Sequence, residues 1–182
     1  MTSDSTINAQ VRKARKIYPI VKYGNPVLEA PTQPVTKFDA ELEELCQDMF
    51  ESMYAAQGVG LAATQIGRNL RLAVVDVTTG KTPEARIVLA NPQIIHTEGE
   101  VREEEGCLSV ADFSAEVRRH ARVSVRGLDR EGKPVTITGE GLLAVVLQHE
   151  VDHLDGILFI DRISRLKRSI YLRRLKKQAA AK

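Results

Sequence analysis

A chain of 182 residues that is 43% hydrophobic and 27% charged fits one globular domain of ordinary size. No stretch approaches the roughly 20 apolar residues of a membrane helix, and no apolar core follows the charged N-terminus, so we expect a cytoplasmic protein without an export signal or membrane contact. The net charge of +2 is unevenly placed, because residues 161–182 hold nine Lys or Arg against one acid and the rest of the chain is acidic.

The N-terminal part predicts a polar lead-in, a wrapping segment and one amphipathic helix. Residues 1–16 lack a clear apolar period and predict a mobile lead-in, while Gly and Pro divide residues 20–36 into turns that should wrap rather than pack deeply. Asp39 can cap a helix that ends before Gly58. The apolar stripe of this helix consists of Leu42, Leu45, Met49, Phe50 and Met53. Cys46 falls on the same stripe and is interpreted as a core residue.

The middle of the chain is rich in β-forming residues. Residues 70–77, 86–89 and 93–95 are separated by Thr-Thr-Gly and Asn-Pro turn signals and predict a small antiparallel sheet. Residues 122–128 and 135–138 flank a polar turn and predict a hairpin.

Two further helices are predicted towards the C-terminus. Apolar residues and histidines share one face of residues 141–155, and Gly156 stands where a C-terminal cap belongs. Residues 164–181 predict a basic helix. Its expected apolar contacts are Leu166, Ile170 and Leu175. Such a charge run is most often a solvated helix face, and approach to a polyanion such as RNA is the alternative.

The segment His149–His153 has the pattern H-E-x-x-H on the first of these helices. The two imidazoles lie one turn apart and can converge on one metal ion, and Glu150 can reach a metal-bound water. If these residues were only core residues, burying two His with Glu and Asp without partners would cost several kcal/mol. The pattern therefore predicts a metal site.

A catalytic metal site needs a third protein ligand and an open position, and Cys107, His96, His120 or an acid can supply that ligand. Cys107 is favoured because it follows a glycine, which permits an unusual backbone path, and two acids that can orient the ligands. The two cysteines lie in different contexts, which favours a reduced compartment over a disulfide.

The segment Gly58–Gln65 is rich in small residues that let a backbone approach a ligand, and Gln65 ends it with an amide donor. Gly58–Ala63 also matches G-x-G-x-x-[GA], with Asp76 about 18 residues further on, as in dinucleotide-binding folds. That fingerprint needs a strand before it and a helix after it. Here a helix precedes, so no nucleotide cofactor is expected.

Gly58–Gln65, Glu105–Ser109 and His149–His153 resemble, in order and spacing, the three sequence motifs of peptide deformylases, and the likeness covers roughly residues 17–163. The resemblance implies an α+β fold in which small antiparallel sheets surround a central helix carrying H-E-x-x-H, with an N-terminal and a C-terminal helix. It implies a catalytic domain over residues 17–163, followed by a basic helix over residues 164–182. The implied substrates are nascent formyl-methionyl peptides.

The resemblance also implies roles for single residues. The implied metal ligands are Cys107, His149 and His153. The ion would be Fe²⁺ in cells, although Zn²⁺, Ni²⁺ or Co²⁺ suit the same ligands. In the implied reaction the metal activates a water, and Glu150 takes its proton and later protonates the departing amine. The Gln65 amide and the Leu108 backbone N–H would receive the charge on the formyl oxygen.

The expected substrate-binding residues come from three segments. Val59 and Gly60 resemble the residues whose backbone pairs with an extended peptide, and Gly106 is expected beside them. The residues Leu142, Val145 and Val146 precede His149 on its helix face, where they can line a slot for methionine or serve core packing.

Three other features bear on the resemblance. Ala111 stands where proline is common in the family, and Arg118 stands where a proline often precedes Arg119, which affects the loop after Cys107 and its peptide contacts. The basic C-terminal helix resembles that of bacterial members in which this element can dock on the ribosome.

Two other functions fit parts of the pattern. An H-E-x-x-H protease would draw its third ligand from downstream of His153, where only Asp155 and Asp161 can serve. An RNA-binding module with a structural zinc would need a fourth Cys or His near the motifs, which is absent from the sequence there.

Overall fold

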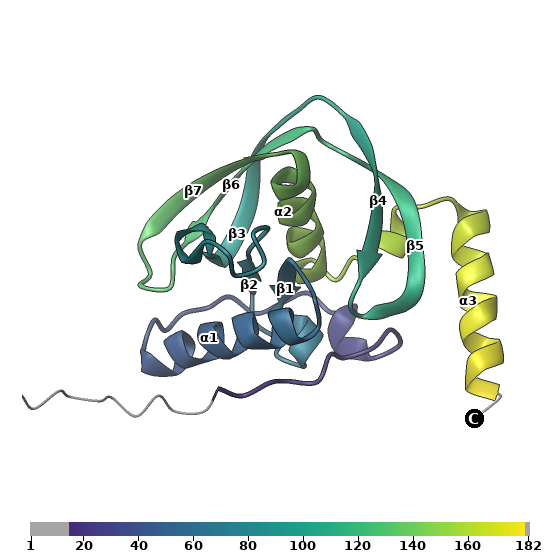
Figure 1. Cartoon of the computed structure of the whole chain (residues 1–182), viewed down its shortest axis with the longest axis horizontal. Coiled ribbons are helices and arrows are strands. Elements are labelled where there is room, and N and C mark those ends of the chain that lie inside the picture. The colour runs from purple at the N-terminus through teal and green to yellow at the C-terminus, as the bar shows by residue number, and fades with distance from the viewer. Residues whose placement is uncertain (1–14, 181–182) are drawn as a thin grey trace, which may run out of the picture.

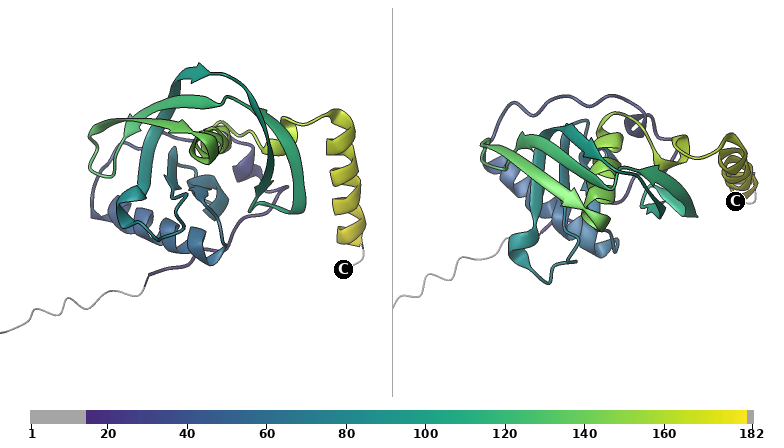
Figure 2. Two further views of the ribbon diagram at one scale, coloured as in Figure 1. Left: turned by 45° about the horizontal axis from the view of Figure 1, so that its top comes forward. Right: turned by 90° about the horizontal axis from the view of Figure 1, so that it is seen from above.

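The computed structural model describes residues 15–180 and has an α+β fold in which antiparallel sheets surround one central helix (Figure 1). The central helix is α2 (Gly141–Leu154), and α1 (Ala40–Ala55) packs against the first two strands of the larger sheet. The helix α3 (Arg165–Ala180) stands at one side of the molecule, outside β5 (Figure 2). No helix within residues 15–180 has the length and apolar character needed to cross a membrane.

The larger sheet has five antiparallel strands in the order β1-β2-β3-β6-β7. Its strands are β1 (Gly60–Ala62), β2 (Leu72–Val75), β3 (Ile87–Glu98), β6 (Arg122–Leu128) and β7 (Pro134–Glu140). The second sheet is a hairpin of β4 (Val101–Cys107) and β5 (Val110–Arg119). The predicted hairpin over residues 122–138 is thus confirmed, and β1 occupies an edge of the larger sheet.

The sequence prediction was wrong about β3 and did not foresee the β4–β5 hairpin. The Asn91-Pro92 signal does not end a strand, because Asn91 takes φ +53° and the register with β6 shifts there, so that the strand continues past an irregularity. The Asn91 side chain also holds the backbone of Val35 with bonds of 2.8 and 2.9 Å. The strands β4 and β5 carry many exposed charged residues, which masks their β character in the sequence.

The predicted first helix is confirmed. The Asp39 side chain accepts hydrogen bonds from the N–H groups of Glu41 and Leu42, both at 3.1 Å, and so caps α1. Cys46 lies in the core as expected, and burial raises the pKa of its thiol to about 12.

The chain before α1 packs more closely than expected. Of the predicted lead-in, residues 1–14 lie outside the described residues, while the Lys16 N–H donates to Asp48 at 3.0 Å. Residues 20–36 were expected to pack shallowly, but Leu28 is fully buried. It ends a short 3-10 helix whose proline start fixes the turn and directs this side chain inwards.

The basic C-terminal helix forms as predicted, but its expected apolar contacts are partly wrong. Leu166 is 67% exposed and Ile170 is 50% exposed, whereas Tyr171 is buried. The helix touches the body through a narrow face centred on Tyr171, whose ring lies 4.7 Å from that of Phe113, and only Leu175 of the predicted contacts joins this cluster. One narrow contact face leaves the other apolar side chains in solvent.

Candidate metal and substrate site

The site begins with the two histidines of α2. Apolar residues of α2 pack against the larger sheet, so that the remaining face turns His149 and His153 towards the end of β4, where Cys107 lies. The Cys107 Sγ is 3.1 Å from the His153 Nε2, and the two imidazole centroids are 4.9 Å apart. Cys107 thus lies next to two histidines that follow it by 42 and 46 positions in the sequence.

The residues at this point fit a divalent metal ion. One ligand atom each from Cys107, His149 and His153 lies within 4.8 Å of the others, and this is the one such cluster of His, Cys, Asp or Glu among residues 15–180. Thiolate and imidazole are ligands that Fe²⁺, Zn²⁺, Co²⁺ and Ni²⁺ accept. Burial lowers the pKa of His153 well below its usual value, which keeps a nitrogen lone pair available. Three protein ligands leave a coordination position open.

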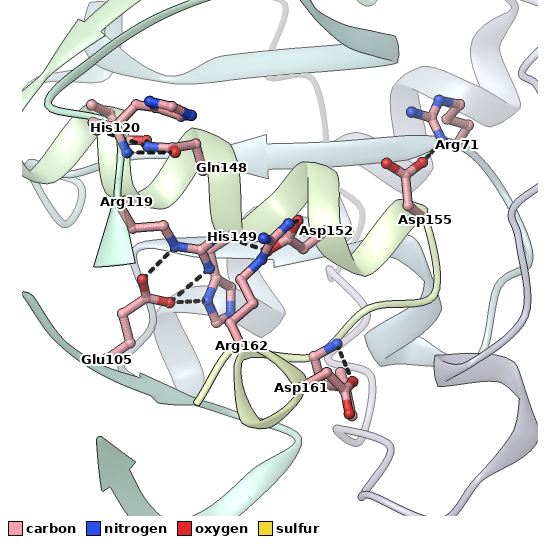
Figure 3. Close-up of polar contacts among 12 residues, drawn as sticks. Arg71, Glu105, Arg119, His120, Gln148, His149, Asp152, Asp155, Asp161 and Arg162 are labelled. Carbon is pink, nitrogen blue, oxygen red and sulfur yellow. Dashed lines mark hydrogen bonds and ion pairs between the residues drawn. The ribbon is translucent and has the colours of Figure 1, made fainter. Parts of the chain in front are cut away.

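A chain of alternating charges, most of it buried, holds His149 in place (Figure 3). The His149 Nδ1 lies 2.9 Å from the Glu105 carboxylate, which receives two bonds from Arg119 at 2.6 and 2.9 Å. Arg119 also donates to Asp152 at 2.6 Å, and Asp152 is paired with Arg162. This arrangement fixes the ring of His149 with its other nitrogen free for a ligand bond.

The charge chain also sets the ionisation of its members. Burial opposes the charged form of Glu105, but hydrogen bonds from Arg119 and His149 outweigh it and lower its pKa to about 2. Burial likewise opposes protonation of His149, yet hydrogen bonds with Cys107 and Glu105 raise its pKa to about 10. The negative partners of His149 thus favour positive charge at its ring, which is carried by a proton or, in its place, by a bound metal ion.

The sequence prediction found only part of this chain. Glu105 orients a ligand as expected, whereas Glu104 points to solvent and accepts a hydrogen bond from Ser114. Arg119 was not foreseen as a site residue. The signal was its inward position in β5, two residues after the buried Val117, where an arginine needs acidic partners.

Glu150 follows His149 on α2 and lines a cleft that Cys107 and His149 also line. Burial raises the pKa of its carboxyl to about 7, and its Oε2 has no hydrogen-bond partner among the described residues. The backbone of Gly60 lies so close that a Cβ there would stand 2.3 Å from the Glu150 Oε1. A side chain at position 60 would therefore displace this carboxyl group.

Gln65 is buried and its amide orientation is fixed. Its Oε1 accepts the Ala62 N–H at 3.0 Å, so that its Nε2 points towards Cys107 and the Ser109 hydroxyl, at 3.6 and 3.3 Å. Leu108 follows Cys107 in the turn between β4 and β5 and lines the cleft with Gln65. The two predicted amide donors thus lie at the same cleft as the ligand residues.

The cleft has a volume of about 570 Å³, and every expected substrate-binding residue lines it. These residues are Val59, Gly60, Gly106, Leu142, Val145 and Val146. Leu142 is 56% exposed at the rim, whereas Val145 and Val146 are buried. Val146 also belongs to the core cluster that α2 forms with the larger sheet, so this residue both packs in the core and lines the cleft.

The edge strand β1 reaches the cleft and is held from behind. The Asp76 N–H donates to the Val59 carbonyl at 2.9 Å. The buried Asp76 carboxylate in turn accepts bonds from the Tyr54 hydroxyl at 2.5 Å and from the Thr78 N–H at 2.8 Å. A fixed sheet edge beside the site can accept an extended peptide as a further strand.

The two departures from the family pattern lie apart. Ala111 lines the cleft next to Asp112, which takes φ +55° where β5 departs from regular pairing with β4. Arg118 is exposed, faces Glu100 at 3.4 Å and lies outside the lining of the cleft. Only the departure at Ala111 therefore alters the wall of the cleft.

The structure also bears on the alternatives. Asp155 is paired with Arg71 at 2.7 Å (Figure 3). Asp161 caps a short 3-10 helix and contacts Arg168. Neither belongs to the cluster of possible ligands, nor does His96 or His120. The segment before Gly58 is a helix, not a strand, which argues against a dinucleotide fold.

Comparison with known sequences gives a consistent result. Residues 17–169 match the family model described as polypeptide deformylase. A peptide deformylase of Acidobacterium capsulatum is 53% identical over 165 residues, which cover 91% of this chain and 97% of that protein. One of Syntrophobacter fumaroxidans is 49% identical, over 89% of this chain and 95% of that protein.

Solved structures agree. A peptide deformylase from Legionella pneumophila is 47% identical and superimposes with a TM-score of 0.84, over 92% of this chain and 99% of that one. One from Thermus thermophilus is 42% identical with a TM-score of 0.82, over 91% of this chain and 96% of that one.

Proposed function

This chain belongs to the polypeptide deformylase family, metal-dependent hydrolases that remove the formyl group from the N-terminus of nascent polypeptides, and we propose how its own side chains carry out that reaction. The observation that carries the proposal is the convergence of Cys107, His149 and His153 within 4.8 Å, next to a cleft that Cys107, His149 and Glu150 line. These three residues would hold the ion. When bound, a divalent metal supplies a Lewis acid and lowers the pKa of water at its open position.

In this proposal Glu150 moves the proton. Its carboxyl group takes a proton from the attacking water and later gives it to the departing amine, so that the methionine leaves with a free N-terminus. A pKa raised by burial to about 7 suits both steps, because a group of that pKa accepts and releases protons at neutral pH. The Glu150 Oε2 supports this role, since it has no hydrogen-bond partner among the described residues and is available to a water.

Gln65 and Leu108 are proposed to receive the negative charge that develops on the formyl oxygen. The Gln65 amide is preoriented by its bond from the Ala62 N–H, so it need not reorganise during the reaction. Loss of one such donor should raise the barrier by about 3 kcal/mol.

The rest of the cleft is proposed to hold the peptide. The methionine side chain would lie against Leu142, Val145 and Val146, while the peptide backbone would pair with Val59 and Gly60 at the edge of the sheet. Backbone pairing is insensitive to side chains, so residues after methionine should matter little.

The direct test is incubation of the metal-loaded protein with formyl-Met-Ala-Ser, with formate and peptide masses both measured. Release of formate with an intact peptide bond is the expected result. Cleavage of the peptide bond would instead support a protease, and neither product would favour a binding role.

We further propose that the protein acts in the cytoplasm, because its substrates emerge from the ribosome. We also propose that the ion bound in cells is Fe²⁺. Thiolate and imidazole ligands do not discriminate strongly among Fe²⁺, Zn²⁺, Co²⁺ and Ni²⁺, so availability decides. Anaerobic purification followed by metal analysis tests the identity of the ion; zinc as the main metal under those conditions would overturn it.

We also propose that α3 docks on the ribosome. Its basic residues surround Leu166 and Ile170, which are exposed, on a helix that stands at the side of the body (Figures 1 and 2). Cosedimentation with ribosomes at low salt should be lost when the exposed Arg173 and Lys177 are changed to Glu, while the formyl-peptide assay stays unchanged. Unchanged cosedimentation would refute the docking.

A further inference from the structure

The segment Val21–Tyr23 lies across the two loops that carry the proposed oxyanion donors. The Val21 N–H donates to the Gln65 carbonyl at 2.8 Å, and the Tyr23 N–H donates to the Ser109 carbonyl at 2.8 Å. The Tyr23 ring also meets Tyr171 of α3 edge-on, with centroids 6.0 Å apart. One short stretch of backbone thus joins two loops that are 44 residues apart in the sequence.

Lys22 stands between these two bonds. Its Nζ donates to the Leu108 carbonyl at 2.8 Å, and within residues 15–180 it is the one Lys or Arg that lines the cleft. Leu108 lies in a tight turn directly after Cys107, and within residues 15–180 its carbonyl oxygen has no other hydrogen-bond partner. The ammonium group is therefore the contact that holds this carbonyl.

We propose that Lys22 is a positioning residue for the deformylation reaction: it fixes the Leu108 turn so that the Leu108 N–H faces the formyl oxygen. The Leu108 carbonyl lies in the peptide plane that Leu108 shares with Ser109, and the Leu108 N–H lies in the adjacent plane shared with Cys107. Holding the carbonyl restricts rotation about the Leu108 Cα, which joins the two planes, and an oxyanion donor works only when its direction is set before the reaction. The inference rests on the proposed function. It assigns a role to a residue outside the three family motifs.

The test compares Lys22→Met, which keeps length and loses charge, with Lys22→Arg, which keeps a donor, and with Lys37→Met as a surface control. Steady-state kinetics with formyl-Met-Ala-Ser should show kcat lowered about tenfold in Lys22→Met at little-changed KM, since the lost orientation matters in the transition state. Lys22→Arg should recover most of kcat, and Lys37→Met should match the parent. An unchanged kcat in Lys22→Met, or a rise in KM alone, would overturn the proposal.

A second measurement does not need turnover. Amide hydrogen exchange of the metal-free protein should be faster at Leu108 and Ser109 in Lys22→Met than in the parent, with α2 unchanged. Equal exchange at both positions would overturn the positioning role even if kcat fell. If the parent releases no formate, the proposed function fails, while faster exchange still supports the structural contact.

Discussion

Replacing Gly60 by alanine is the sharpest test of how Glu150 is held. A Cβ at position 60 would lie 2.3 Å from the Glu150 Oε1 and 2.9 Å from the Val146 Cγ1. Ordinary contacts begin near 3.4 Å, so the carboxyl group has to withdraw by about 1 Å. Overpacking of this kind costs about 1–3 kcal/mol of stability, and a displacement of about 1 Å at a reacting group can lower the rate about a hundredfold.

The assay for Gly60→Ala combines formate release, metal content and thermal unfolding. We expect kcat to fall about a hundredfold with metal content retained, because the ligand residues are not displaced. In a Glu150→Ala background the same change should cost clearly less stability, since most of the steric conflict is with that carboxyl group. Parental kcat and stability in Gly60→Ala, or an equal stability loss in both backgrounds, would refute the reasoning.

Three further predictions follow from the site and its support. Glu150→Gln should keep the metal but lose most turnover, because an amide cannot carry the proton; metal analysis and formate release check this, and loss of metal would contradict it. Cys107→Ala should bind metal much more weakly while the core variant Cys46→Ala keeps its stoichiometry; equal metal content in both would remove Cys107 from the ligand set. Burial opposes ionisation of Asp76, but hydrogen bonds from Thr78, Tyr54 and the Gly80 N–H outweigh it and lower its pKa to about 2. Its carboxylate therefore stabilises the fold by about 1–2 kcal/mol above about pH 5, and this is lost as pH falls towards 2. In urea unfolding of the metal-free proteins, the unfolding free energies of Asp76→Asn and the parent should converge as the pH is lowered. A difference that stays constant with pH would contradict this role of Asp76.

The sequence predicted best where local periodicity and chemistry coincide. The helix bearing His149 and His153 has a regular apolar face, and the hairpin at β6 and β7 has a polar turn between alternating strands. The residues next to Cys107 in the sequence favoured it over His96 and His120 as the third ligand. In the structure Cys107 lies with the two helix histidines, whereas His96 and His120 do not.

The remainder depends on contacts between distant segments. Arg119 orients the site only because β5 places it between Glu105 and Asp152, and no local sequence pattern predicts those ion pairs. Lys22 likewise reaches Leu108 across 86 positions. The exposure of Ile170 could not be foreseen, because the width of the surface that receives α3 is a property of the folded body.

The alternating charges behind His149 have a consequence for metal exchange. They join β4, β5, α2 and the segment after it, so the imidazole is anchored by the protein and not by the ion. His149 thus keeps its place when an ion leaves, and one divalent ion can replace another without refolding of the chain. Enzyme in a cell would then carry whichever suitable ion reaches it, and its activity would follow metal supply.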